Sequence, residues 1–153
     1  MKFIIRTFLT AAVVLTSVAN TPVQAQFAKP EQAIKYRKSV FNIMGTHFGR
    51  VGAMVQGKVP FDAKIAAENI AAVNAVTKLP WPAFIEGTDK GDAKSKIWTE
   101  KVAFDEKAQD MQKAVAALHE TTKSGNFTLD QLKTAFAAAG KTCGSCHDAY
   151  KNK

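Results

Sequence analysis

The chain contains 153 residues, 46% of them hydrophobic, and carries a formal net charge of +8 at pH 7. This length is enough for one domain with its own core but too short for two. The 21 lysines and arginines are scattered rather than gathered into a run. A solvated surface therefore explains the positive charge, and we expect no nucleic-acid partner.

The first 25 residues have the pattern of an export signal. Lys2 and Arg6 precede an apolar run over residues 8–18, and a small-residue cleavage site ends at Ala25. This run is too short to cross a bilayer, and no later segment reaches the necessary length. We therefore predict that the signal is removed, that residues 26–153 form a single periplasmic domain, and that the domain does not insert into the membrane.

The first half of the mature sequence predicts two helices and no strand. One helix is expected over about residues 31–55, after Pro30, because proline is favoured at the start of a helix and apolar residues then recur at helical spacing. A second helix is expected from the potential cap Asp62 to Leu79.

The second half predicts a crossover loop followed by two further helices. Two prolines and two glycines mark residues 80–92 as the loop, and a third helix is expected over about 94–122. Residues 128–131 form a capping box that opens the fourth helix, and its apolar stripe continues to Tyr150. These elements predict an all-α fold, an antiparallel four-helix bundle.

The fourth helix ends in the string Cys143-Gly144-Ser145-Cys146-His147. On a helix, both thiols and the imidazole share one face, so the thiols can bond the two vinyl groups of a porphyrin while His147 ligates the iron. A redox-active cysteine pair is the alternative, but such a pair usually opens a helix after a strand, whereas this one closes the last helix. We therefore predict one haem c, bound covalently inside the bundle near its C-terminal helix.

Residues 26–153 resemble the cytochrome c' family, the class II c-type cytochromes. The resemblance is carried by residues 26–30, Tyr36-Arg37, residues 47–50, residues 79–81, Ile97-Trp98 and residues 143–150. It implies a four-helix bundle with a C-terminal haem site. It also implies a homodimer formed through the first and second helices.

The resemblance further bears on the sixth coordination position of the iron. In low-spin relatives a methionine on the first helix fills this position, and here the matching residue is Phe41, which has no lone pair to offer. The resemblance therefore implies five-coordinate iron with Phe41 on the distal side. Met44, three residues further along the same stripe, is the alternative ligand. His47 and His119 are not expected to be axial.

Four more residues are candidate haem contacts. Arg37 matches the arginine that binds a haem propionate in the relatives, and a plain surface arginine is the alternative. Lys151 occupies the place of a basic residue near the proximal face, although a solvated lysine at a helix end is an equally good interpretation. Trp81 and Phe84 are expected to form a lid or part of the core around the cofactor.

These features favour a gas-binding protein. An apolar distal pocket stabilises neither anions nor bound dioxygen, so neutral nitric oxide and carbon monoxide remain as ligands. The alternative function is electron transfer, with a redox partner protein that a basic rim near the haem would steer. Catalytic turnover is not expected, because no general acid, base or nucleophile is evident near the haem.

Overall fold

A computed structural model describes residues 26–152, and the predicted signal sequence lies outside these residues. The described chain is helical, and its only β-type pairing is an isolated bridge between Ala93 and Lys151. The helices are α1 (Pro30–Val55), α2 (Ala63–Val76), the short 3₁₀ helix η2 (Trp81–Ala83), α3 (Lys96–Thr99), α4 (Lys101–Thr122) and α5 (Leu129–Tyr150).

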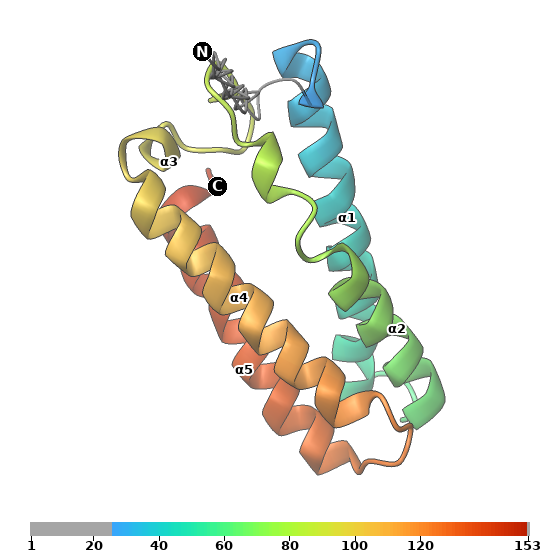
Figure 1. The fold of residues 1–153 in the computed structure, drawn as a ribbon. Coiled ribbons are helices and arrows are strands. Elements are labelled where there is room, and N and C mark those ends of the chain that lie inside the picture. The colour runs from blue at the N-terminus through green and yellow to red at the C-terminus, as the bar shows by residue number, and fades with distance from the viewer. Residues whose placement is uncertain (1–25, 153) are drawn as a thin grey trace, which may run out of the picture.

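The four long helices run alternately up and down, so the predicted antiparallel four-helix bundle is confirmed (Figure 1). α1 packs against α2, α2 against α4, and α4 against α5. α1 and α5 meet more sparsely, and one such contact is the stacking of Phe48 on Phe136, with ring centroids 4.1 Å apart. The pair α1 and α2 and the pair α4 and α5 therefore leave space between α1 and α5.

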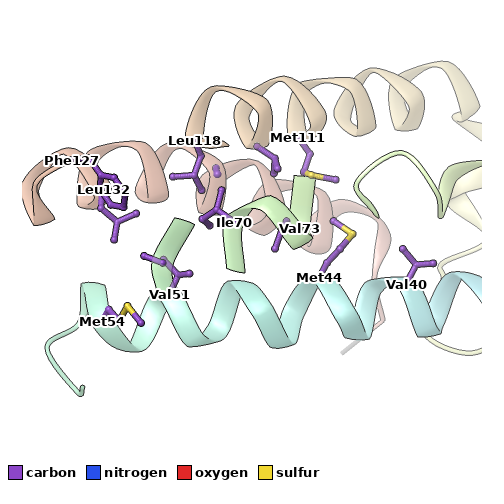
Figure 2. Close-up of a cluster of buried hydrophobic side chains, with 13 residues drawn as sticks. Val40, Met44, Val51, Met54, Ile70, Val73, Met111, Leu118, Phe127 and Leu132 are labelled. Atoms are coloured by element: carbon purple, nitrogen blue, oxygen red, sulfur yellow. The ribbon is translucent and has the colours of Figure 1, made fainter. Parts of the chain in front are cut away.

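The main core lies between these helix pairs and consists mainly of aliphatic and methionine side chains, together with Phe127 (Figure 2). Ile70, Leu118 and Leu132 are completely buried within it. A second cluster of Phe84, Ile97, Phe104 and Tyr150 closes the other end of the bundle, where the crossover loop, α3, α4 and the end of α5 come together. Apolar packing thus holds both ends of the enclosed space.

Helix α2 begins as predicted, with the carboxylate of Asp62 accepting a hydrogen bond from the Ile65 amide at 2.9 Å. It ends at Val76, earlier than the predicted Leu79. The Thr77 carbonyl accepts a hydrogen bond from the Trp81 indole at 2.7 Å, which ties the start of the crossover loop back onto the end of the helix.

The predicted third helix is divided, so the continuous helix expected over 94–122 is wrong. Glu100 interrupts it with φ −119° and ψ 40°. Contacts outside the segment explain the break, because the Trp98 indole donates to the Ile85 carbonyl at 2.9 Å and the Lys94 amide donates to the Tyr150 carbonyl at 3.0 Å. These contacts orient α3 toward the loop and the end of α5.

None of the helices within residues 26–152 combines the length and apolar character that a bilayer crossing requires.

Candidate haem site

Helix α5 carries the predicted attachment residues on one continuous surface. Its first turn is held by the predicted capping box, in which Thr128 Oγ1 accepts from the Gln131 amide at 3.2 Å and Gln131 Oε1 accepts from the Thr128 amide at 2.8 Å. Because the helix then continues without a break to Tyr150, Cys143, Cys146 and His147 stand at positions i, i+3 and i+4.

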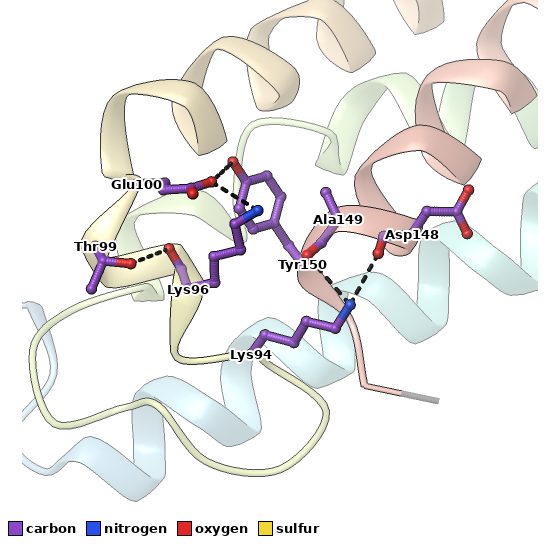
Figure 3. Close-up of polar contacts among 7 residues, drawn as sticks. All are labelled: Lys94, Lys96, Thr99, Glu100, Asp148, Ala149 and Tyr150. Atoms are coloured by element: carbon purple, nitrogen blue, oxygen red, sulfur yellow. Dashed lines mark hydrogen bonds and ion pairs between the residues drawn. The ribbon is translucent and has the colours of Figure 1, made fainter.

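The C-terminal end of α5 is fastened to the segment before α4 (Figure 3). Lys94 Nζ donates to the carbonyls of Asp148 at 3.0 Å and Ala149 at 3.4 Å, which places its charge at the negative end of the helix dipole. The Tyr150 hydroxyl donates to Glu100 at 3.3 Å. These contacts fix the turn that carries His147.

A cavity of about 1140 Å³ lies against α1, the crossover loop, α4 and α5. All nine residues proposed for the site line it: Arg37, Phe41, Met44, Trp81, Phe84, Cys143, Cys146, His147 and Lys151. The volume slightly exceeds the usual range for small-molecule sites, about 300–1,000 Å³, as a large planar cofactor requires. The structure thus brings together residues more than one hundred positions apart in sequence.

The protonation states of the two cysteines and the histidine suit haem attachment. Burial is the main cause that raises the pKa of the Cys143 and Cys146 thiols, so both are protonated at neutral pH. Burial also lowers the pKa of His147, and nearby Lys151 adds to this effect. A neutral imidazole keeps the lone pair that an iron ligand needs. Two thiols and one neutral imidazole on one cavity wall therefore fit a covalently bound haem.

The wall supplied by α1 and the loop contains an aromatic group. Phe41 is half-buried and makes edge contacts with Trp81 and Phe84, at centroid distances of 5.6 and 6.2 Å. The two indole N–H groups of this region are already used, since Trp81 donates to the Thr77 carbonyl and Trp98 to the Ile85 carbonyl. Phe41, Trp81 and Phe84 accordingly present carbon surface rather than free donors, while polar residues such as Arg37 and Asn42 line other parts of this wall.

Met44, the alternative sixth ligand, lines the cavity but also belongs to the main core cluster. It is 8% exposed, and Figure 2 shows it among the buried side chains between Val40 and Val73. His47 and His119 do not line the cavity. His47 instead pairs through Nδ1 with Asn69 Oδ1 at 2.8 Å, which links α1 to α2.

Arg37 is only 3% exposed, so the alternative of a plain surface arginine is wrong. Its guanidinium donates to the carbonyls of Ala83, Thr88 and Lys90 and to the Thr88 hydroxyl, at 2.5–3.4 Å. No carboxylate of residues 26–152 pairs with it, and burial lowers the pKa of this group. A buried cation without an acidic partner in the described chain is suited to receive a negative group of a ligand.

Lys151 is the exposed C-cap residue of α5 and lines the cavity. Its position is compatible with both sequence interpretations, a group near the proximal face and a solvated lysine at the helix end. Sequence reasoning missed Thr88, which is completely buried and holds Arg37. A lone threonine in a charged loop carries no signal of that role.

A helical bundle whose last helix presents two thiols and an imidazole to an apolar cavity defines a bundle-type c-type cytochrome. Residues 32–151 match the sequence profile of the family described as Cytochrome C'. The chain belongs to the cytochrome c' family. Its cofactor is haem c, attached through Cys143 and Cys146.

Individual relatives agree over most of the chain. The cytochrome c' of Rubrivivax gelatinosus is 48% identical over 131 residues, which cover 84% of this chain and 100% of the relative. Its crystal structure has a TM-score of 0.77 at 47% identity, with 83% of this chain and 100% of that chain covered.

Two ligand complexes of mutants of the Alcaligenes xylosoxidans cytochrome c prime are also similar, both at 41% identity. The nitric oxide complex has a TM-score of 0.77 and covers 84% of this chain and 99% of that chain. The carbon monoxide complex has a TM-score of 0.76 and covers 84% of this chain and 100% of that chain.

Proposed function

We propose that this cytochrome is a periplasmic protein that captures nitric oxide, and also binds carbon monoxide, at a five-coordinate haem iron. The observation that carries the proposal is the aromatic group that α1 and the crossover loop contribute to the cavity wall: Phe41, Trp81 and Phe84 line the cavity there and offer iron no ligand atom. The nitric oxide and carbon monoxide complexes of the Alcaligenes protein support the same conclusion.

When bound, haem c supplies an iron that coordinates small diatomic gases. His147 provides the protein ligand, and its lowered pKa keeps the imidazole neutral for that task. Phe41 and its aromatic neighbours exclude water and give no hydrogen bond to an anion or to bound dioxygen. The pocket therefore favours neutral gases, because it stabilises neither anions nor bound dioxygen.

Arg37 is proposed to neutralise a haem propionate. Its terminal nitrogens are engaged with the crossover loop, whereas Nε has no hydrogen-bond acceptor among residues 26–152. A carboxylate at Nε would compensate the buried charge, because charge-assisted hydrogen bonds are about twice as strong as neutral ones. Lys151 is proposed to lie near the proximal face, since it follows His147 by one turn and lines the cavity.

Electron transfer is the second candidate function. Lysines at positions 35, 38, 90 and 151 line the cavity, and only Lys38 among them forms an ion pair within residues 26–152, with Asp92 at 3.6 Å. This positive rim would attract an acidic redox partner, in which case gas binding would be incidental.

Export and dimerisation complete the proposal. The signal pattern of residues 1–25 supports cleavage after Ala25 and a periplasmic location. Ile43 on α1 and Ile65 on α2 are 44% and 45% exposed. A second copy that packs on α1 and α2 would cover such residues, which supports a homodimer.

The ferrous optical spectrum, recorded with and without nitric oxide, tests the function. A broad high-spin Soret band with no sharp α band, which changes when nitric oxide is added, is the expected result. A split low-spin α/β pair would mean that Met44 or another side chain fills the sixth position. That outcome would replace gas capture with electron transfer.

A further inference from the structure

Thr88 is the centre of a hydrogen-bond clamp on the crossover loop. Its hydroxyl accepts from Arg37 Nη1 at 2.8 Å, and its carbonyl accepts from Arg37 Nη2 at 2.5 Å. The same hydroxyl donates its proton to the Ile85 carbonyl at 2.6 Å. Thr88 is completely buried, so water cannot replace these partners.

This clamp is connected to the aromatic wall of the cavity. The Arg37 guanidinium lies over the Phe84 ring, 4.5 Å from its centroid, a distance typical of a cation–π contact. Phe84 in turn contacts Phe41 and stacks on Trp81, with 6.2 Å between ring centroids in both pairs. Contacts therefore run from Thr88 through Arg37 and Phe84 to Phe41.

Phe41 has to turn aside if gas is to reach the iron past this wall. Its ring meets the stacked rings of Trp81 and Phe84 edge-on, and Phe84 belongs to the loop segment 83–90 that Arg37 holds. How readily Phe41 turns thus depends on how firmly residues 83–90 are held.

We propose that Thr88 is a positioning residue that sets the rate of gas entry by holding Arg37 and the loop against Phe41. This inference rests on the proposed gas-binding function. Thr88 does not line the cavity, so it acts only through the residues that it holds. Arg37 is a poorer probe, because its replacement would also disturb the proposed propionate contact.

The test uses the ferrous holoprotein and compares Thr88→Val with Thr88→Ser, which retains the hydroxyl. Stopped-flow spectroscopy gives the carbon monoxide association rate, and hydrogen–deuterium exchange with mass spectrometry gives the protection of backbone amides 83–90. Thr122→Val is the matched control. Thr122 is also completely buried and donates to the Leu118 carbonyl at 3.0 Å, but its hydroxyl bonds only carbonyls of its own helix and does not hold Arg37 or the loop.

We expect Thr88→Val to bind carbon monoxide roughly tenfold faster, which corresponds to about 1.4 kcal/mol in the barrier and is within the worth of a hydrogen bond to a charged donor. Amides 83–90 should also exchange faster. Thr88→Ser and Thr122→Val should keep the wild-type rate and protection. If Thr88→Val does not fold, Thr88→Ala replaces it with the same expectations.

An unchanged association rate in Thr88→Val would overturn the inference while the proposed function stands. An increase of equal size in Thr122→Val would also overturn it, because the effect would then be general loosening. If the wild-type protein itself does not take up carbon monoxide, the proposed function fails and the gating role fails with it.

Discussion

Replacement of Phe41 by alanine tests the distal wall directly. In the folded protein the ring makes two edge contacts, with Trp81 and with Phe84. Each aromatic pair is worth about 0.5–1.5 kcal/mol, so turning the ring away from both costs roughly 1–3 kcal/mol. Without the ring that cost disappears, and carbon monoxide should associate about 5- to 150-fold faster, at about 1.4 kcal/mol for each factor of ten.

Stopped-flow mixing of ferrous protein with carbon monoxide measures this rate. Phe61→Ala is the matched control, because Phe61 is also half-buried and makes an edge contact with Phe127 at 5.9 Å, but it does not line the cavity. The control should keep the wild-type rate. Equal rates for Phe41→Ala and the wild type would show that Phe41 does not limit access, and the reasoning about the α1 wall would be refuted.

His147→Ala should abolish the native ferrous spectrum even if both thioethers form, and a normal optical spectrum would contradict the axial assignment. Thr128→Ala should lower the free energy of unfolding by about 1 kcal/mol through loss of the cap. Urea titration measures this free energy, with the exposed mid-helix Thr134→Ala as control. An equal loss of stability in both variants would show that the cap makes no special contribution. Burial and the hydrogen bond to Glu100 raise the pKa of Tyr150, so stability present below the usual tyrosine pKa of about 10 should fall as the pH rises above it. In urea titrations at several pH values, Tyr150→Phe should reduce this loss of stability at high pH. An unchanged loss would mean that another group causes it.

Helix α5 was predictable because every local signal agrees. The capping box at Thr128 fixes its start, and one apolar stripe leads from there to the cysteines. The cavity lining was also within reach of the sequence, since the resemblance drew attention to Arg37 and Phe41 on α1 and to Trp81 in the loop, and all three line the cavity. Local patterns and family similarity were sufficient wherever a residue's role depends on its own helix face.

The parts that were missed depend on contacts between distant segments. Glu100 lies inside a good helical pattern, and the break there follows from the attachment of Trp98 to the loop and of Lys94 to the end of α5. The burial of Arg37 is likewise produced by the loop that folds over it. Neither periodicity nor spacing contains this information, because the residues in each of these contacts are 13 to 56 positions apart in the sequence.

Within residues 26–152, the cavity has one wall from the first long helix and another from the last. No product of interrupted synthesis, and none that proteolysis has shortened before α5, possesses both sides of the pocket. Such fragments lack Cys143, Cys146 and His147, so the haem absorbance of a preparation can come only from molecules that extend through α5.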